Sequence, residues 1–383
     1  MLIKIERYKY ALLFACLSMF VLGLADNIRG PLFADLMNFF KLTNSEGSLS
    51  FAVTSAAALF GNIVTAPLMR KMTLARLLLL SVFLMMVGLF FMAISPTFTF
   101  YLLSALIFGF SFGLMGVVQN LIVAENIDSE KQPKYLSALH GIYGFASLLA
   151  PLLASRAPEL LGPWRSAFYV TSAICFLVLI SGIFIYSLTP FEIHQISQAQ
   201  LSRKAPRPLL FAIGGILAFY VTAEIMVATR LALYMRTAFN MNLEQSSNYV
   251  SYFFVFLLIG RILFAVKTFS YSLKQQLNAS LILSLIFLGF GLWVHPFLLT
   301  VVGLAMAPFY PISVAYISDL TGVDKRKFIT FAISFQSLCV ITMHMGVGFL
   351  TDRYGLFYAF GVAIVSLLLS LVCVNFHPKI SST

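Results

Sequence analysis

The chain has 383 residues, of which 60% are apolar and only 10% are charged, and its formal net charge is +11. Soluble domains carry about 25% charged residues, so this composition excludes a soluble single-core enzyme, a secreted disulfide scaffold and a disordered tail. In a membrane protein the basic excess is expected from Lys and Arg in cytoplasmic loops, which removes the case for nucleic acid as a partner. The four cysteines lie inside apolar runs without metal-ligand spacing, so no disulfide, metal or other cofactor is expected.

Twelve stretches are apolar enough to be membrane helices, each of which needs roughly 20 residues. They are predicted at 9–40, 47–68, 74–95, 98–124, 135–157, 165–188, 208–236, 246–267, 275–293, 296–319, 328–351 and 355–376. The longer polar connection, 189–207, falls between the sixth and seventh stretches. The sequence therefore predicts an all-α membrane protein with twelve transmembrane helices in two pseudo-symmetric six-helix halves. These halves are 1–188 and 208–383, and 189–207 is a cytoplasmic linker.

The distribution of Lys and Arg indicates the orientation of the chain. With both ends inside, eighteen of the 25 basic residues fall in cytoplasmic segments and five fall on the opposite side, among them Lys41 and Arg353. This bias follows the positive-inside rule. We expect a multi-pass protein of a bacterial inner (plasma) membrane with both termini cytoplasmic, acting as a monomer in the lipid bilayer.

The two halves also repeat each other in sequence. Gly61 and Gly260 end matching helices 199 residues apart, and Gly109 and Gly303 lie 194 residues apart in another matching pair. Parallel repeats of this kind occur in secondary transporters, where the solute site lies near the middle of the membrane. This repeat points to a transporter built from two related halves.

Several local motifs resemble those of one transporter family. They are Gly23–Asn27 with Pro31, Leu139–Gly144 with Pro151, Trp164-Arg165, Tyr220–Glu224, Gly260-Arg261 and Ala307–Pro311. Over essentially its whole length, and at Gly260-Arg261, the chain resembles the major facilitator superfamily, and the other motifs resemble its fucose-permease-like branch. The resemblance implies the major facilitator fold, alternating access and proton coupling at Asp26. The chain departs from the family where Thr65 replaces an acidic residue four positions after a glycine, so the inner gate of this half is expected to differ.

Two carboxylates inside predicted spans, Asp26 and Glu224, are the candidate proton-coupling residues. A charged side chain within a bilayer is costly, which makes such residues functional candidates. Asp26 and Arg29 are three residues apart, on one helix face, and are expected to pair. Apolar surroundings favour the protonated form of a carboxylate, so either residue could take up and release a proton. A structural ion pair is the alternative for each.

Other polar side chains within the spans are candidates for substrate binding, because a polar solute needs partners that replace its water. They are Asn27, Arg29, Gln119, Asn120, His140, Tyr143, Tyr220, Arg230 and Gln336. Each could instead hold two helices together, and Arg230 could reach the outer interface. Five charged residues near inner helix ends are expected to form gating salt bridges: Glu125 with Arg70 and Lys71, and Asp319 with Arg261.

The sequence thus favours a secondary active transporter and not an enzyme. It contains no HExxH motif and no cluster of Asp and His ligands. The leading hypothesis is proton-coupled symport of a small polar solute, either sugar-like or bearing a carboxylate, by alternating access. An organic-anion (phosphate or carboxylate) antiporter and a drug or metabolite exporter of the same superfamily stay open as alternatives. The expected partners are the small-molecule substrate and a proton.

Overall fold

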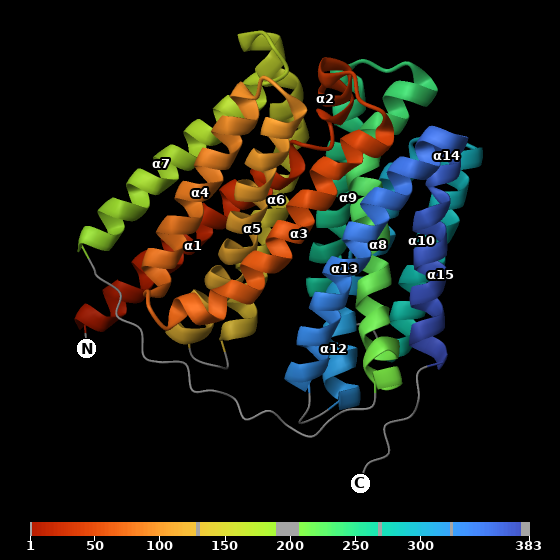
Figure 1. The fold of residues 1–383 in the computed structure, drawn as a ribbon. Helices are drawn as coiled ribbons and strands as arrows, with labels where there is room; N and C mark the ends of the chain where they lie inside the picture. The colour runs from red at the N-terminus through yellow and green to blue at the C-terminus, as the bar shows by residue number, and fades with distance from the viewer. Residues whose placement is uncertain (1, 128–130, 189–206, 267–269, 322–324, 377–383) are drawn as a thin grey trace. The chain divides into compact units, whose positions relative to one another are not determined.

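The computed structural model describes residues 2–127, 131–188, 207–266, 270–321 and 325–376, and every regular element within these ranges is a helix (Figure 1). Among the described residues, twelve helical segments are long and apolar enough to cross a membrane, so the chain is a multi-pass membrane protein. The predicted all-α class with twelve spans is confirmed. Most of the expected linker, residues 189–206, lies outside the described residues, as do both chain ends.

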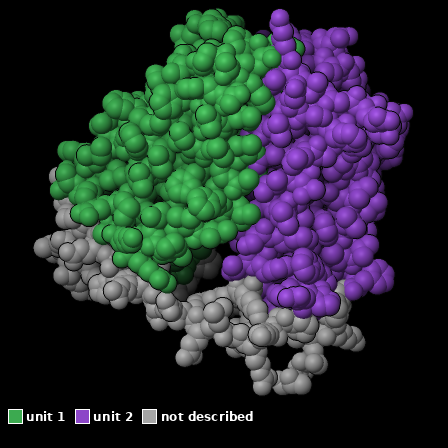
Figure 2. Space-filling model, viewed as in Figure 1, with its two compact units in different colours: residues 1–40, 53–198 green, residues 41–52, 199–383 purple. Residues whose placement is uncertain are grey.

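The chain forms two compact units, which Figure 2 distinguishes by colour. The first unit comprises residues 1–40 and 53–198, and the second comprises residues 41–52 and 199–383. Helices of the first unit are α1 (Leu2–Asn27), α2 (Phe33–Phe40), α4 (Leu74–Ile94), α5 (Phe98–Asn126), α6 (Gln132–Leu161) and α7 (Ser166–Leu188). Those of the second are α8 (Arg207–Phe239), α9 (Leu243–Val266), α10 (Leu273–Trp293), α11 (Leu298–Met306), α12 (Phe309–Thr321), α13 (Lys325–Tyr354), α14 (Leu356–Ala359) and α15 (Gly361–Phe376). Helix α3 (Asn44–Met69) contributes to both.

The first predicted span is not one continuous helix. Instead of running to residue 40, α1 ends at Asn27 and α2 begins at Phe33 after a turn. Gly30 and Pro31 lie in that turn, and Pro31 has no backbone N–H with which to continue the helical ladder. Pro308 separates α11 from α12 in the same way. Both interruptions fall at motifs that the sequence places inside a span.

Capping side chains fix the starts of several spans. The Thr73 hydroxyl accepts from the backbone N–H of Arg76 at the start of α4, and Thr97 caps α5 in the same manner. Ser272 and Gln275 form a reciprocal capping box at the start of α10. Such caps satisfy N–H groups that have no partner within the helix, which matters where the chain enters the bilayer.

The two units share one packing pattern. In the first, α1 packs on α6 and α7 while α4 packs on α5 and α7; in the second, α8 packs on α13 and α15 while α10 packs on α11 and α15. Gly61 packs against the backbone carbonyl of Phe110, and Gly260 packs close to that of Leu304. The residues in these two contacts are related by the offsets of 199 and 194 found in the sequence.

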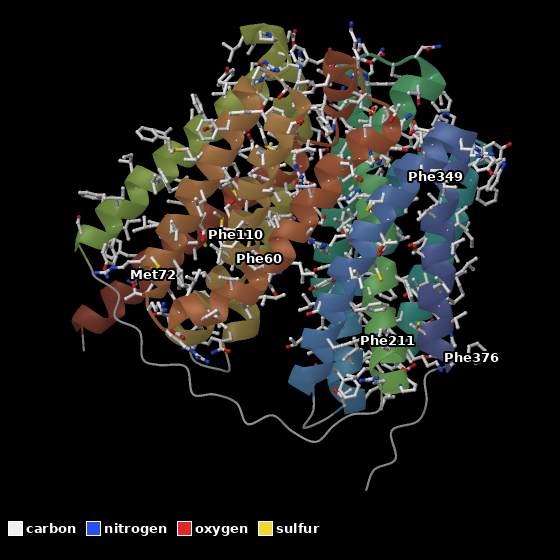
Figure 3. All side chains as sticks on the ribbon, in the orientation of Figure 1. Phe60, Met72, Phe110, Phe211, Phe349 and Phe376 are labelled. Atoms are coloured by element: carbon white, nitrogen blue, oxygen red, sulfur yellow. The ribbon has the colours of Figure 1, made fainter. Side chains whose placement is uncertain are left out.

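Large apolar side chains cover the outside of both units. Figure 3 labels Phe60, Phe349 and Phe376, whose exposed fractions are 59%, 59% and 80%. In the first unit the rings of Phe60 and Phe110 lie 5.9 Å apart between centroids. Exposed rings at this density would favour aggregation in water and are expected against lipid acyl chains.

Candidate functional site

Asp26 lies near the end of α1 and accepts two side-chain hydrogen bonds. Its Oδ1 accepts from Arg29 Nη2 at 2.5 Å, and its Oδ2 accepts from the Tyr143 hydroxyl of α6 at 2.7 Å. The pairing expected from the three-residue spacing is therefore present. The Arg29 side chain is 9% exposed and the Asp26 side chain 26%, so the carboxylate is the more accessible member of the pair.

Asn27 attaches the end of α1 to α6. Its Nδ2 donates to Ser147 Oγ at 2.9 Å and to the Gly23 carbonyl at 3.0 Å. Ser147 in turn donates to the Tyr143 carbonyl at 2.8 Å. The sequence analysis missed Ser147, because a lone serine in an apolar helix usually bonds its own backbone and carries no distinguishing signal.

The turn after α1 directs Arg29 toward α5. The guanidinium carbon of Arg29 lies 4.9 Å from the ring centroid of Phe108, within cation–π range. Arg29 thus has a carboxylate and an aromatic face as neighbours. These two neighbours together fix the position of the Arg29 side chain, because a planar guanidinium can pair with a carboxylate at its edge and stack on a ring with its face.

Glu224 lies midway along α8 and forms the corresponding pair in the second unit. Its Oε1 lies 3.8 Å from Arg261 Nη2 of α9, which is longer than a hydrogen bond. Tyr220 lies beside Glu224, one turn earlier on α8, and donates its hydroxyl to the Met306 carbonyl at 2.7 Å. Its ring stacks on Phe309 with centroids 4.1 Å apart. The Glu224 pair therefore joins two helices, whereas the Asp26 pair belongs to one short segment.

Arg261 pairs with a different carboxylate from the one expected, and its gating role stays a prediction. We expected it to pair with Asp319, but its guanidinium faces Glu224, whose side chain is 17% exposed. Asp319 is exposed near the end of α12. A carboxylate within a span gains more from a counter-charge than one that water already solvates, which explains the choice of partner. Arg70, Lys71 and Glu125 are exposed at the ends of α3 and α5, and their gating role stays a prediction.

The uncharged candidates occupy different environments. Gln119 of α5 is fully buried and donates from Nε2 to Ser18 Oγ of α1 at 2.9 Å. Asn120 donates to the carbonyl of Gly116 in its own helix at 2.7 Å, and His140 is exposed on α6. Gln336 is half-buried on α13. Among the described residues, the Oε1 atoms of Gln119 and Gln336 are buried and accept no hydrogen bond.

The Arg230 side chain of α8 is buried inside the protein. Its exposed fraction is 1%, it donates to Ser48 Oγ at 2.8 Å, and its guanidinium carbon lies 5.1 Å from the Phe51 ring centroid. Both neighbours belong to the beginning of α3. Arg230 is therefore buried between helices, and its depth in the membrane and its role in binding stay predictions. It places Arg230 with α3, apart from the Glu224 pair.

Solved transporters share this fold over nearly the full chain. A bacterial homologue of the human lysosomal transporter Spinster, inward-facing and occupied, has a TM-score of 0.78 at 12% identity and covers 96% of both chains. A D-xylose-proton symporter has a TM-score of 0.76 at 14% identity, with 97% of this chain and 98% of that one covered. FucP in the outward conformation has a TM-score of 0.62 at 16% identity, covering 98% and 100%. These likenesses establish the fold and do not favour the fucose-permease-like branch.

Two characterised relatives differ in what they carry. The chain is 20% identical over 310 residues to the multidrug efflux pump SdrM of Staphylococcus aureus (strain N315), covering 79% of this chain and 67% of that protein. It is 32% identical over 152 residues to the Homo sapiens sodium-dependent glucose transporter 1, covering 40% of this chain and 29% of that protein. Because one distant relative is a drug pump and the other a sugar transporter, these comparisons do not identify the solute.

Residues 15–298 match the family model of the Major Facilitator Superfamily, which is well over half of the chain. The twelve spans, the repeated packing of the two units and the solved structures agree with that match. The chain therefore belongs to the Major Facilitator Superfamily and is a membrane secondary transporter of a small molecule, not an enzyme.

Proposed function

We propose that this protein is a proton-coupled symporter of a small polar solute, working by alternating access, with Asp26 and Glu224 as its proton-binding residues. The observation that carries the proposal is a carboxylate–arginine pair within the spans of each unit, Asp26 with Arg29 and Glu224 with Arg261. Ionisable groups inside a bilayer are expensive to keep, and in transporters they mark ion and solute pathways.

The Asp26 pair suggests how a proton and a solute are coupled. Protonation of Asp26 removes the negative charge that holds Arg29, while a neutral carboxyl still accepts from Tyr143. Arg29 is then free to donate to a solute carboxylate or hydroxyl. Solute binding and proton uptake therefore favour each other, which is the thermodynamic requirement for symport.

The charge balance favours a solute that is neutral or carries its own carboxylate. Each carboxylate in the two pairs is matched by one arginine, so neither pair leaves a net charge. In the first unit, Asn27 and Tyr143 add donors and acceptors of the kind that hydroxyl-rich solutes need. The likenesses to a D-xylose-proton symporter and to a sodium-dependent glucose transporter support a sugar-like solute.

Proton flux into proteoliposomes tests this proposal. Purified protein is reconstituted with a pH-sensitive dye inside, and D-xylose, D-glucose or lactate is added outside. We expect one of these solutes to drive proton entry in the wild type. Asp26→Asn or Glu224→Gln should abolish accumulation driven by the pH gradient and leave solute exchange largely intact, because an amide still bonds but carries no proton.

Glu159→Gln is the matched control for both variants. Glu159 also pairs with an arginine three residues away, Arg156, at 2.5 Å, but its side chain is 56% exposed. This variant should transport as the wild type does. Unchanged proton coupling in both Asp26→Asn and Glu224→Gln would contradict the proposal and leave these carboxylates as structural ion pairs.

Export of a drug is the second candidate, supported by the 20% identity to the multidrug efflux pump SdrM. It predicts that cells expressing the protein retain less ethidium and that Asp26→Asn reverses this. Exchange of phosphate or carboxylate anions is tested in the same vesicles with glycerol 3-phosphate on both sides. Anion exchange without proton movement would favour the antiporter alternative.

A further inference from the structure

The turn before α7 carries an arginine that has no carboxylate as a counter-charge. Arg165 directly precedes Ser166, the first residue of the helix, and its Nη2 donates to the carbonyl of Ser95 at the end of α4. Among the described residues, that carbonyl is the one hydrogen-bond acceptor of Arg165, and Tyr169 is the one titratable group that acts on its charge. A guanidinium has five N–H donors, so most of the donors of Arg165 have no acceptor within the described chain.

The residues on either side of Arg165 also carry donors without acceptors. Trp164 Nε1, Arg165 Nε and Ser166 Oγ are buried atoms that have no hydrogen-bond partner among the described residues, and Ser166 is 4% exposed. The Trp164 and Arg165 side chains as a whole are half-buried, so a small rotation opens their donors to a ligand. The start of a helix favours negative charge, and unpartnered buried donors are costly. The three consecutive donors therefore indicate an anionic acceptor from outside the chain.

Aromatic rings hold the guanidinium of Arg165 in place. Its carbon lies 4.1 Å from the ring centroid of Phe39 in α2 and 5.7 Å from that of Trp164. Rings stack on the faces of a guanidinium and leave its N–H edges available. Those edges match the oxygen spacing of a phosphate, which accepts two parallel hydrogen bonds from one arginine.

An apolar groove of about 380 Å³ begins next to this arginine, between α4 and α7. The two helices pack side by side in the first unit (Figure 1). The groove is lined by Met86, Phe90 and Phe91 of α4 and by Tyr169, Ala173 and Phe176 of α7. Tyr169 lies one turn after Arg165, and Phe91 lies one turn before Ser95. The groove therefore runs from the arginine into the span, for seven residues of α7 or about 10 Å.

We propose that Arg165 and this groove together bind one phospholipid that has an anionic headgroup. The lipid phosphate accepts hydrogen bonds from Arg165 and from the start of α7, and one acyl chain lies along the groove. A cation at the end of two spans with an apolar groove beside it matches the place where headgroup and acyl chain join in a bilayer. A zwitterionic headgroup brings its own cation and gains less from Arg165. This binding is independent of the solute and of proton coupling.

Tryptophan fluorescence tests the headgroup preference, because bromine atoms on an acyl chain quench a nearby indole. The chain has two tryptophans, Trp164 at the proposed site and Trp293, which is 68% exposed at the end of α10 in the second unit. Purified Trp293→Phe in detergent micelles is titrated with brominated phosphatidylglycerol and with brominated phosphatidylcholine. We expect the anionic lipid to quench Trp164 with about five- to tenfold higher affinity. In Trp164→Phe, Trp293 reports ordinary lipid contact and should show no such preference.

Two substitutions at Arg165 separate its charge from its packing. In the Trp293→Phe background, Arg165→Gln should abolish the preference for phosphatidylglycerol, whereas Arg165→Lys keeps the cation and should keep most of it. Arg156→Gln is the matched control, because Arg156 is exposed near the end of α6 and already pairs with Glu159 at 2.5 Å. Its preference should stay that of the parent. Because each comparison is a ratio of two lipids on one protein, a lower stability of Arg165→Gln does not enter it.

A larger side chain in the groove tests the place of the acyl chain. Ala173→Phe fills the groove and should lower the affinity of both lipids at Trp164 by about four- to tenfold, as expected when one or two methylenes lose their contacts. Leu177→Phe, one turn further along α7, is the control. Leu177 is 64% exposed and does not line the groove, so this substitution should leave both affinities unchanged.

Several results would overturn the lipid site. These are equal affinities of the two lipids at Trp164, an equal preference at Trp293, a preference that survives Arg165→Gln, and one that is lost equally in Arg165→Lys. Unchanged quenching in Ala173→Phe would exclude the groove. Displacement of the brominated lipid by an excess of glycerol 3-phosphate would show that the donors take a small soluble anion instead of a lipid.

Discussion

Gly303 packs directly against the backbone carbonyl of Phe253, so a side chain at this glycine would collide with main chain that cannot rotate away. Gly109 meets the carbonyl of Thr54 in the same way in the first unit. The two contacts join α9 to α11 and α3 to α5, which are corresponding spans of the repeat. Duplication of the sequence has thus preserved the closest backbone approaches of each unit.

Alanine at Gly109 or Gly303 should therefore destabilise the protein by about 1–3 kcal/mol, the usual range for overpacking. Gly116→Ala, also in α5, is the control, because a Cβ there meets nothing within 4 Å. It should be neutral or stabilising by up to about 1 kcal/mol, since alanine is the better helix former. Thermal unfolding in detergent measures all three. Equal thermal unfolding midpoints in the wild type and the variants would contradict the expected overpacking at these two glycines.

The attachment of α1 to α6 predicts a difference between two asparagines. Asn27→Ala loses the bonds to Ser147 and to the Gly23 carbonyl and should destabilise the protein by about 1–2 kcal/mol. Asn120→Ala loses a bond within its own helix and should cost less than about half of that. The same unfolding assay compares them. A larger loss of stability from Asn120→Ala than from Asn27→Ala would contradict the role of Asn27 in attaching α1 to α6.

Arg165, in the turn between α6 and α7, should contribute more to stability than its partial exposure suggests. Its guanidinium carbon lies 4.1 Å from the Phe39 ring centroid, and it donates to the Ser95 carbonyl. Arg165→Gln should destabilise by about 1–2 kcal/mol through loss of these contacts. Arg156→Gln breaks only an exposed pair with Glu159 and should stay within about 0.5 kcal/mol.

The loss of stability caused by Arg165→Gln should not depend on pH in the physiological range. Burial lowers the pKa of the Arg165 guanidinium from its usual value. A base whose pKa is lowered in the folded state carries the full cost of burying its charge at every pH below that pKa. Stability rises only as pH climbs from the folded-state pKa toward the unfolded-state pKa, where the unfolded chain binds more protons. Arginine starts above about 12, so stability differences measured between about pH 5 and 9 should be constant. A stability difference between wild type and Arg165→Gln that changes with pH over this range would point to another titrating group.

Local features of the site could be predicted from the sequence, and long-range partners could not. The Asp26–Arg29 pair follows from a spacing of three residues. The break between α1 and α2 was missed, although Pro31 removes a backbone donor there. The partners Tyr143 and Ser147 are more than 100 residues from Asp26 and Asn27, and periodicity within one helix does not say which other helix it will face.

The orientation of the chain is directly testable. We propose that both termini are cytoplasmic and that Lys41 and Arg353 face the outside, because eighteen of the 25 basic residues then lie inside. Single cysteines at 41 and 353 should react with a membrane-impermeant maleimide in intact cells, and a cysteine at 200 should react only after lysis. Labelling at 200 in intact cells would contradict this topology.

Arg29→Gln should separate the two kinds of solute that the Asp26 pair could serve. If the protein carries an organic anion, Arg29 binds it through charged hydrogen bonds worth about 1.5–3 kcal/mol, so affinity should fall by about ten- to a hundredfold. If it carries a neutral sugar, binding should change less, while proton coupling is lost because Asp26 no longer has its counter-charge. Binding of D-xylose, D-glucose, lactate and glycerol 3-phosphate to wild type and variant distinguishes these outcomes, with Arg156→Gln as the unaffected control. Failure of every solute to bind, together with lowered ethidium retention in cells, would reject both forms and favour an exporter.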